Sequence, residues 1–260
     1  MIENLHGSLL TPPALLPAQS ERAVAGRAPR PESTQNSLLA AVSRTEYRRL
    51  LGMLEPVTLT FGDVLYEPGD VISHVYFPGV SLVSLLTLVD HHLALEVGLV
   101  GREGMVGIPL ALGVGVSSTR ALVQGAGVAM RMKSAHFLKE LGHSLPLQRA
   151  ILRYTHALMA QVARTAACNR FHVVEERLAR WLLMTQDRAH STQFRVTHEF
   201  LSYMLGVRRV GITAAAGALQ RSGLVEYHRG EMTVLDRSGL EATACACYAA
   251  DRQAYADHLR

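Results

Sequence analysis

The sequence contains little cysteine and little lysine. Of its 26 basic residues only Lys133 and Lys139 are lysine, so arginine carries almost all of the positive charge. Its three cysteines are Cys168, Cys245 and Cys247. A small, odd number of cysteines in a chain of 260 residues provides no disulfide framework. This composition indicates a reducing compartment.

The sequence also lacks a long hydrophobic run and a secretory signal. Its longest uncharged apolar runs, 76–89 and 104–116, are shorter than a bilayer span. No basic segment precedes the apolar residues near the N-terminus. Hydrophobic residues make up 48% of the chain and charged residues 18%, which is typical of a globular protein. We therefore expect a cytoplasmic protein with no transmembrane helix.

The positive charge lies in the second half of the chain. Residues 41–133 contain seven basic and eight acidic side chains, whereas residues 170–235 contain nine basic and six acidic ones. A near-neutral front module and a basic back module are typical of a sensor joined to a nucleic-acid binder.

Local patterns divide the chain further. Residues 1–36 are rich in proline and predict a mobile tail. An amphipathic helix is expected over 38–54. Over 57–132, short β-prone runs alternate with Pro-Gly and Gly-Asp turns, which favours an all-β barrel or sandwich. Residues 134–189 contain almost no glycine and predict long helices.

One apolar stripe within these helices leaves two interpretations open. Its members recur at spacings of three and four and are Leu147, Ile151, Tyr154, Leu158 and Val162. The stripe predicts either a coiled-coil seam between two chains or a helix packed on its own barrel. This stripe is the candidate dimerisation surface that the sequence offers.

Residues 197–223 carry the pattern of a helix-turn-helix. Thr197 is suited to cap a helix over 198–205, and Gly206 permits the left-handed residue of a tight turn. A second helix is expected from about Arg208 to Ser222, ending at Gly223. Two short helices joined by a glycine turn are the signature of this DNA-binding motif.

The second helix has an apolar face and a face of small side chains. The inward face comprises Ile212, Ala215, Ala216 and Leu219, and the outward face comprises Val210, Thr213, Ala214, Gly217 and Arg221. Small outward residues let a helix lie deep in a major groove. Arg208 and Arg209 cost about 0.3–1 kcal/mol each against the helix dipole. A bidentate contact to guanine, worth about 1–3 kcal/mol, offsets this cost when DNA is bound.

A hairpin follows the second helix. Residues 224–228 and 231–235 alternate like paired strands, and Arg229-Gly230 supplies a two-residue turn. We interpret the hairpin as a wing whose tip presents His228 and Arg229 to a phosphate backbone.

These residues together resemble the Crp/Fnr family of bacterial transcription regulators. The most specific stretches are VEERLARWLL (174–183), THEFLSYMLGVRRVGITAAAGALQRSGLVEY (197–227) and RGEMTVLDRSGLE (229–241). The resemblance implies an α+β chain with an N-terminal cyclic-nucleotide-binding-like β-roll (jelly-roll), a long dimerisation helix and a C-terminal winged helix-turn-helix. The implied parts are a tail (1–36), a β-roll effector domain (37–144), the dimerisation helix (145–170), the DNA-binding domain (171–245) and a C-terminal tail (246–260).

The family also implies function. Its members act as homodimers on near-palindromic double-stranded DNA and contact RNA polymerase. The DNA-binding residues expected here are Thr197, Arg208, Arg209, Val210, Thr213, Ala214 and Arg229. Family recognition helices begin with Ser-Arg-Glu followed by a further arginine. Here Arg208-Arg209-Val210 stands at the start and Ala214 at the later position, so only Arg209 carries over directly and a different half-site is implied.

The sequence of the expected β-roll effector domain departs further from the family pattern than the DNA-binding region does. Members that bind cyclic nucleotides place a Gly-Glu pair before a loop that ends in Arg-Ser or Arg-Thr. The nearest equivalents here, Glu103, Ser118 and Arg120, lie in a longer loop with the order reversed to Thr119-Arg120. A cyclic-nucleotide-responsive module with its ligand near Glu103 and Arg120 is the alternative function.

No other cofactor and no enzyme activity is predicted. Iron–sulfur members hold their cluster through cysteines near the N-terminus, and none precedes Cys168. Cys245 and Cys247 lie in a helical context, where residues two apart point in different directions, so they make a poor metal clamp. Cys168 and His172 alone amount to two ligands, so no metal site is expected. The sequence also lacks a nucleophile–base pair, a metal cluster and a phosphate loop at recognisable spacing.

Overall fold

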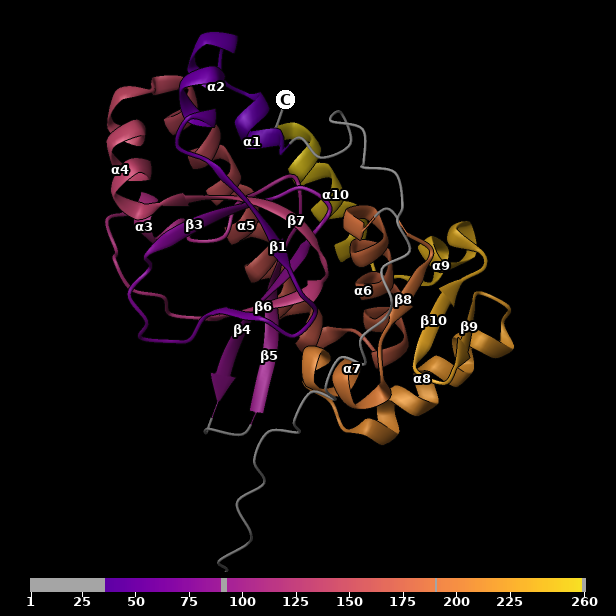
Figure 1. Ribbon diagram of the computed structural model, residues 1–260. Coiled ribbons are helices and arrows are strands. Elements are labelled where there is room, and N and C mark those ends of the chain that lie inside the picture. The colour runs from indigo at the N-terminus through magenta and orange to yellow at the C-terminus, as the bar shows by residue number, and fades with distance from the viewer. Residues whose placement is uncertain (1–35, 90–92, 190, 259–260) are drawn as a thin grey trace, which may run out of the picture.

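The computed structural model describes residues 36–89, 93–189 and 191–258. Over these residues a β-barrel is followed by a long helix and a winged helix-turn-helix module (Figure 1). The expected tail at 1–36 lies outside the described residues except for Asn36. The mixed α and β architecture agrees with the fold class expected from the sequence.

The single helix expected over 38–54 is two short helices, α1 (Ser37–Ala40) and α2 (Arg44–Leu51). The break comes from Ser43, whose backbone is extended and whose side chain accepts a hydrogen bond from the Glu46 amide. Glu46 bonds back to the Ser43 amide, which completes a capping box. Local capping therefore starts a new helix within a segment where the apolar periodicity alone predicts one continuous helix.

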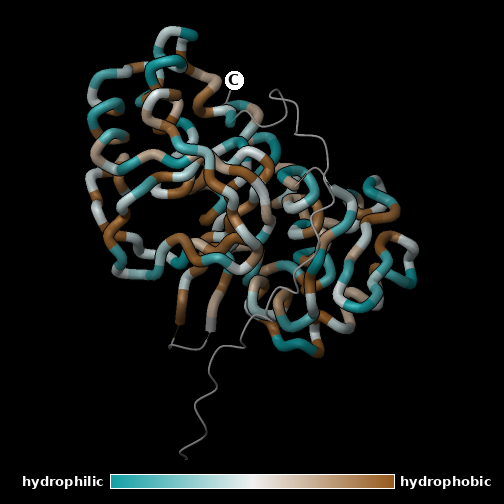
Figure 2. Tube along the Cα trace, in the orientation of Figure 1, coloured by the Kyte–Doolittle hydropathy of each residue, from teal (hydrophilic) through white to brown (hydrophobic). Residues whose placement is uncertain are grey.

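The β-rich region forms a barrel of two antiparallel sheets, as its turn spacing predicts. Its elements are β1 (Glu55–Leu59), β2 (Val64–Tyr66), β3 (His74–Pro78), β4 (Leu82–Val89), β5 (Leu93–Val100), α3 (Ile108–Ala111), β6 (Arg120–Gly125) and β7 (Gly127–Lys133). One sheet has the order β1-β7-β3 and the other β2-β6-β4-β5. Val75, Val83 and Val123 fill the interior with no exposed surface. Figure 2 shows hydrophobic segments concentrated along these strands.

Three helices follow the barrel: α4 (Ser134–His143), α5 (Leu145–Phe171) and α6 (Val174–Ala189). The stripe predicted as a dimer seam faces the barrel of its own chain. Leu147, Ile151, Tyr154 and Leu158 are buried in the same core as the strands, and only Val162 is exposed. Tyr154 lies so close to Gly104 that a β-carbon there would stand 2.2 Å from its ring.

The C-terminal module contains a second core. Its elements are β8 (Gln193–Arg195), α7 (His198–Leu205), α8 (Arg209–Arg221), β9 (Val225–His228), β10 (Glu231–Val234) and α9 (Arg237–Thr243). Leu178, Leu201 and Ile212 are fully buried in this core. The core also includes Leu86 of β4 and Leu99 of β5, so α6 and α7 cover one face of the barrel.

The residues assigned to a C-terminal tail form a further helix, α10 (Cys247–His258), which packs back against α5 and α6. Asp251 is 2% exposed and accepts hydrogen bonds from Arg164 at 2.5 Å and from Arg180 at 2.6 Å. The ion pair with Arg164 therefore attaches this helix to α5, and the ion pair with Arg180 attaches it to α6.

A buried carboxyl group lies where the barrel meets α6. Glu96 of β5 is 9% exposed and accepts a hydrogen bond from Ser84 Oγ at 2.7 Å. Burial raises its pKa from 4.5 to about 7, and the hydrogen bond from Ser84 offsets only part of this effect. Because the pKa is raised in the folded state, the stability that Glu96 contributes is complete below about pH 4.5 and is lost as the pH rises through 7.

We expect the unfolding temperature of the wild type to fall between pH 5 and pH 8.5, and that of Glu96→Gln to fall less. By linkage, the substitution should add roughly 3 kcal/mol of stability at the upper pH relative to the lower. Thermal unfolding across this range measures the difference, with Glu226→Gln on the exposed side of β9 as the control. Parallel pH profiles of wild type and Glu96→Gln would show that another group causes the pH dependence.

Candidate nucleic-acid interface

The first helix of the motif has the bounds expected from the sequence. Thr197 accepts a hydrogen bond from the Phe200 amide at 3.0 Å and caps α7. Gly206 ends the helix with φ 61° and ψ 39°, in the left-handed region. A side chain is strained in this conformation, so glycine allows the tight turn that sets the angle between α7 and α8.

The second helix, α8, presents the face that its periodicity predicts. Ile212, Ala215, Ala216 and Leu219 are buried beneath it. Val210 is 73% exposed, and Thr213 and Ala214 are also exposed. The outer surface of α8 thus consists of short side chains along the helix and arginines at its start.

Arg208 and Arg209 are exposed at this start. Arg208 is the N-cap residue with φ −66° and ψ 144°, and Arg209 is the first helical residue. None of the ion pairs found among the described residues includes either side chain. The two cations therefore project from the helix terminus without a carboxylate partner, which is the arrangement that an anionic ligand can use.

The structure adds His198, which sequence reasoning missed. Its Nδ1 lies 3.0 Å from Thr213 Oγ1, and Thr213 donates to the Arg209 carbonyl at 3.1 Å. Its ring stacks on Tyr227 with centroids 4.3 Å apart. Burial and the adjacent Arg209 lower the pKa of His198 below its usual value. A neutral imidazole thus fixes Thr213 on the exposed face of α8. The sequence gives no local signal for this contact, because His198 and Thr213 are fifteen residues apart.

The hairpin after α8 is the wing that was predicted. His228 pairs with Glu231, and Arg229 and Gly230 form the turn with φ 49° and 84°. A third strand, β8, extends the wing to the order β8-β10-β9. The Val196 amide donates to the Gly230 carbonyl at 2.9 Å. The wing tip therefore lies beside the start of α7.

The three residues considered for an effector pocket do not form one cluster of contacts. Glu103 accepts a hydrogen bond from Arg188 of α6 at 2.7 Å. Arg120 pairs with Glu67 at 2.9 Å and donates to the Tyr203 hydroxyl at 3.4 Å. Ser118 is exposed. Both charged groups therefore already have protein partners of opposite charge, and no hydrogen bond or ion pair between the described residues joins them.

One expectation about metal ligands was wrong. The sequence predicts one helix through Cys245 and Cys247, but α9 ends before Ala244 and α10 begins at Cys247. Because the backbone is irregular between them, their side chains do not point apart. Cys168, His172, Cys245 and Cys247 all approach one another.

Comparison with known proteins gives both the domain and the fold. Residues 176–243 match the model of the Crp-like helix-turn-helix domain. No curated protein sequence matches the chain. FixK2 from Bradyrhizobium japonicum has a TM-score of 0.63 at 14% identity, with 74% of this chain and 98% of that chain covered. The c-di-GMP-responsive regulator CLP from Xanthomonas campestris has 0.61 at 18% identity, covering 74% and 99%. A CRP-family transcriptional regulator from Thermus thermophilus has 0.60 at 20% identity, covering 72% and 96%.

Residues 176–243 therefore match a Crp-like helix-turn-helix domain, and the described chain shares the fold of solved regulators of the Crp/Fnr family. No helix among the described residues is long and apolar enough to cross a membrane.

Proposed function

We propose that the protein is a homodimer that reads a near-palindromic operator, with one α8 in the major groove of each half-site. The observation that supports this most directly is the exposed face of α8. Arginines without carboxylate partners among the described residues stand at its start, and short side chains follow as far as Gly217. Such a face can approach base edges closely while the arginines contact guanine or phosphate.

Each residue of the surface has a proposed role. Arg209 contacts a guanine edge, Val210 contacts a thymine methyl and the Thr213 hydroxyl oxygen accepts at a neighbouring base. Ala214 leaves room for the helix to enter the groove. Thr197, Arg208 and Arg229 contact phosphates, which fixes the orientation of the module without reading sequence.

The dimer seam that we propose is the exposed side of α5. Its apolar members are Leu152 at 52% and Met159 at 65% exposure, followed by the exposed Ala163 and Ala166. The spacings of seven, four and three residues are those of a two-stranded coiled coil. This stripe differs from the one that the sequence offered as a candidate dimerisation surface, because the barrel covers that one.

Selection of DNA from a random library by the purified protein tests the proposal. We expect a two-fold symmetric motif whose half-site centres lie about one helical turn apart. Its enrichment should weaken as the salt concentration rises, because arginine–phosphate contacts release counterions. A selection at two salt concentrations measures both effects, and an asymmetric motif would contradict the dimer.

The remaining assignments follow from this function. A regulator of this type acts on chromosomal DNA in the cytoplasm and contacts RNA polymerase. An effector would act on the barrel, but Glu103 and Arg120 are each held by protein partners. No observation favours the cyclic-nucleotide alternative.

A further inference from the structure

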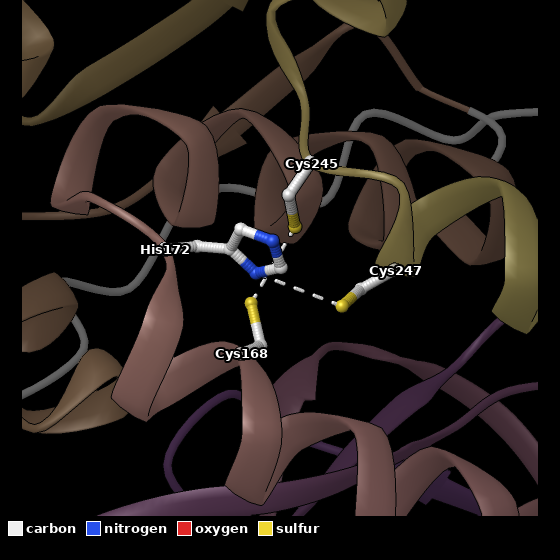
Figure 3. Close-up of side chains that lie close together, drawn as sticks. All are labelled: Cys168, His172, Cys245 and Cys247. Carbon is white, nitrogen blue, oxygen red and sulfur yellow. Dashed lines mark hydrogen bonds between the residues drawn. The ribbon is translucent and has the colours of Figure 1, made fainter.

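Four side chains with metal-binding atoms converge where α5, α9 and α10 meet. Cys168 lies in the last turn of α5, and His172 follows this helix directly. Cys245 lies in the segment before α10, and Cys247 is the first residue of α10 (Figure 3). Their ligand atoms all lie within 4.8 Å of one another. Cys168 Sγ is 3.5 Å from Cys245 Sγ, and Cys247 Sγ is 3.7 Å from His172 Nδ1.

We propose that these four residues bind a single zinc ion. In a tetrahedral site with Zn–S bonds of about 2.3 Å and Zn–N bonds of about 2.0 Å, sulfur–sulfur and sulfur–nitrogen pairs of ligand atoms are roughly 3.5–3.8 Å apart. The two distances of 3.5 and 3.7 Å fall in this range. Three cysteines and one histidine are one of the standard ligand sets of structural zinc. The sets that leave a coordination position open for catalysis use three protein ligands, so this site is closed.

The spacing favours one ion over a cluster. An iron–sulfur cluster holds its ligands on different iron atoms, which are separated by bridging sulfides, so its ligand atoms lie farther apart than those around one ion. All four ligand atoms here fit within 4.8 Å. Thiolate and imidazole ligands also select zinc against magnesium and calcium, which prefer oxygen.

The fold brings the ligands together by two local features. Cys168 and His172 are four residues apart, so they lie on one side of the last turn of α5, and the His172 amide donates to the Cys168 carbonyl at 3.1 Å. On the other side, Ala244 has extended backbone angles and interrupts the helices. The chain therefore turns at Cys245, and α10 starts with Cys247 facing the same point.

Charge around the cluster supports a bound centre that is negative overall. Arg177 is 7% exposed, its Nε has no hydrogen-bond partner, and none of the ion pairs among the described residues includes it. Arg177 and Cys168 line the same cavity of about 30 Å³. A buried guanidinium without a counter-charge is costly. A divalent ion with three thiolates and a neutral imidazole carries one net negative charge, which would offset the cation of Arg177.

An ion pair attaches α10 beside the four ligands. Arg180 of α6 pairs with Asp251 of α10 at 2.6 Å, so the ion pair and the proposed metal site attach the same helix.

The proposed ion would act as a clamp at a junction between two modules. Only His172 and Val173 separate the end of α5 from the start of α6, which belongs to the DNA-binding module. A ligand at His172 and two ligands beside α10 would fix both the junction and the C-terminal helix. The proposal concerns this clamp and does not rest on the operator-reading function.

Metal binding by the untagged wild type is the first test. The reduced protein, stripped of metal, should bind one zinc ion per chain by elemental analysis after gel filtration. Titration with cobalt should give the visible bands of tetrahedral Co²⁺ and a thiolate-to-metal charge-transfer band with the intensity of three thiolates. Hydrogen exchange in 247–258 should slow when zinc is added. Absence of the cobalt bands in folded wild type would overturn the proposal.

Variants assign the ligands. Cys247→Ser, which changes a half-buried side chain, should weaken zinc binding by more than about 100-fold. His172→Cys should retain the metal and add a fourth thiolate to the cobalt spectrum. His143→Gln, at an exposed histidine on α4, should bind like the wild type. Unchanged zinc affinity in Cys247→Ser would overturn the assignment.

A disulfide between Cys168 and Cys245 is the competing chemistry. Their sulfur atoms are 3.5 Å apart, which exceeds the roughly 2.05 Å of a bonded pair, so a small movement would be needed. A purified protein that carries this disulfide, with a mass two hydrogens lower, and takes up no metal after reduction would contradict the zinc site. Metal uptake after reduction, with both sulfurs contributing to the cobalt spectrum, supports it.

Discussion

Arg209→Ala is expected to lower affinity for the selected operator by roughly 30-fold to 10⁴-fold while leaving affinity for random DNA nearly unchanged. A bidentate arginine–guanine contact discriminates by about 1–3 kcal/mol, and a dimer makes two of them. Arg209 is exposed at the first position of α8, and none of the ion pairs among the described residues includes its side chain. Binding curves with the operator and with a scrambled duplex at one salt concentration measure the ratio.

Arg229→Ala is the matched control, since it removes one exposed arginine of the same module from the wing tip. It should weaken binding to operator and scrambled DNA to a similar extent and reduce the slope of log affinity against log salt by about two for the dimer. If Arg209→Ala behaved in the same way as Arg229→Ala, Arg209 would be a phosphate contact and α8 would read DNA through other residues.

The reading surface also depends on residues that do not contact DNA in this proposal. Thr213 is held between His198 Nδ1 and the Arg209 carbonyl, and the ring of His198 is held by Tyr227. These contacts join α7, α8 and β9. The orientation of the hydroxyl on the exposed face is therefore fixed before any DNA binds, which reduces the entropic cost of recognition.

The parts of the DNA-binding module that sequence predicted are those determined over a few residues. Thr197 caps α7 through the amide three residues later, and Gly206 adopts the left-handed angles that only its own lack of a side chain makes easy. Helical periodicity alone placed Ile212 and Leu219 beneath α8. The turn at Arg229 follows from its neighbour Gly230 in a two-residue loop.

The parts that sequence did not predict depend on contacts between distant residues. Periodicity showed that α5 has an apolar stripe at Ile151 and Leu158, but not whether a barrel or a second chain covers it. Cys168 and Cys245 of the proposed zinc site lie 77 residues apart, and they meet because α10 packs on α5. The ion pair between Glu103 and Arg188 likewise joins a barrel loop to α6 across 85 residues.

Met159→Glu is expected to convert the protein to monomers at micromolar concentration. Met159 is 65% exposed at the centre of α5, one heptad after Leu152, so in a parallel coiled coil it faces its own copy. Two glutamates would then oppose each other in an apolar seam, where neither has a partner. Sedimentation analysis measures the mass. Loss of the second half-site should lower operator affinity by roughly 10²-fold to 10⁴-fold.

Two controls separate the seam from the fold. Leu138→Glu changes a leucine that is 45% exposed on α4, so it should leave both the dimer and operator binding intact. Leu158→Ala removes a side chain that is 8% exposed against the barrel, so it should lower the free energy of unfolding by about 2–5 kcal/mol and leave the folded protein dimeric. If Met159→Glu stayed dimeric while folded Leu158→Ala dissociated, the dimer seam would instead be the stripe that includes Ile151 and Leu158.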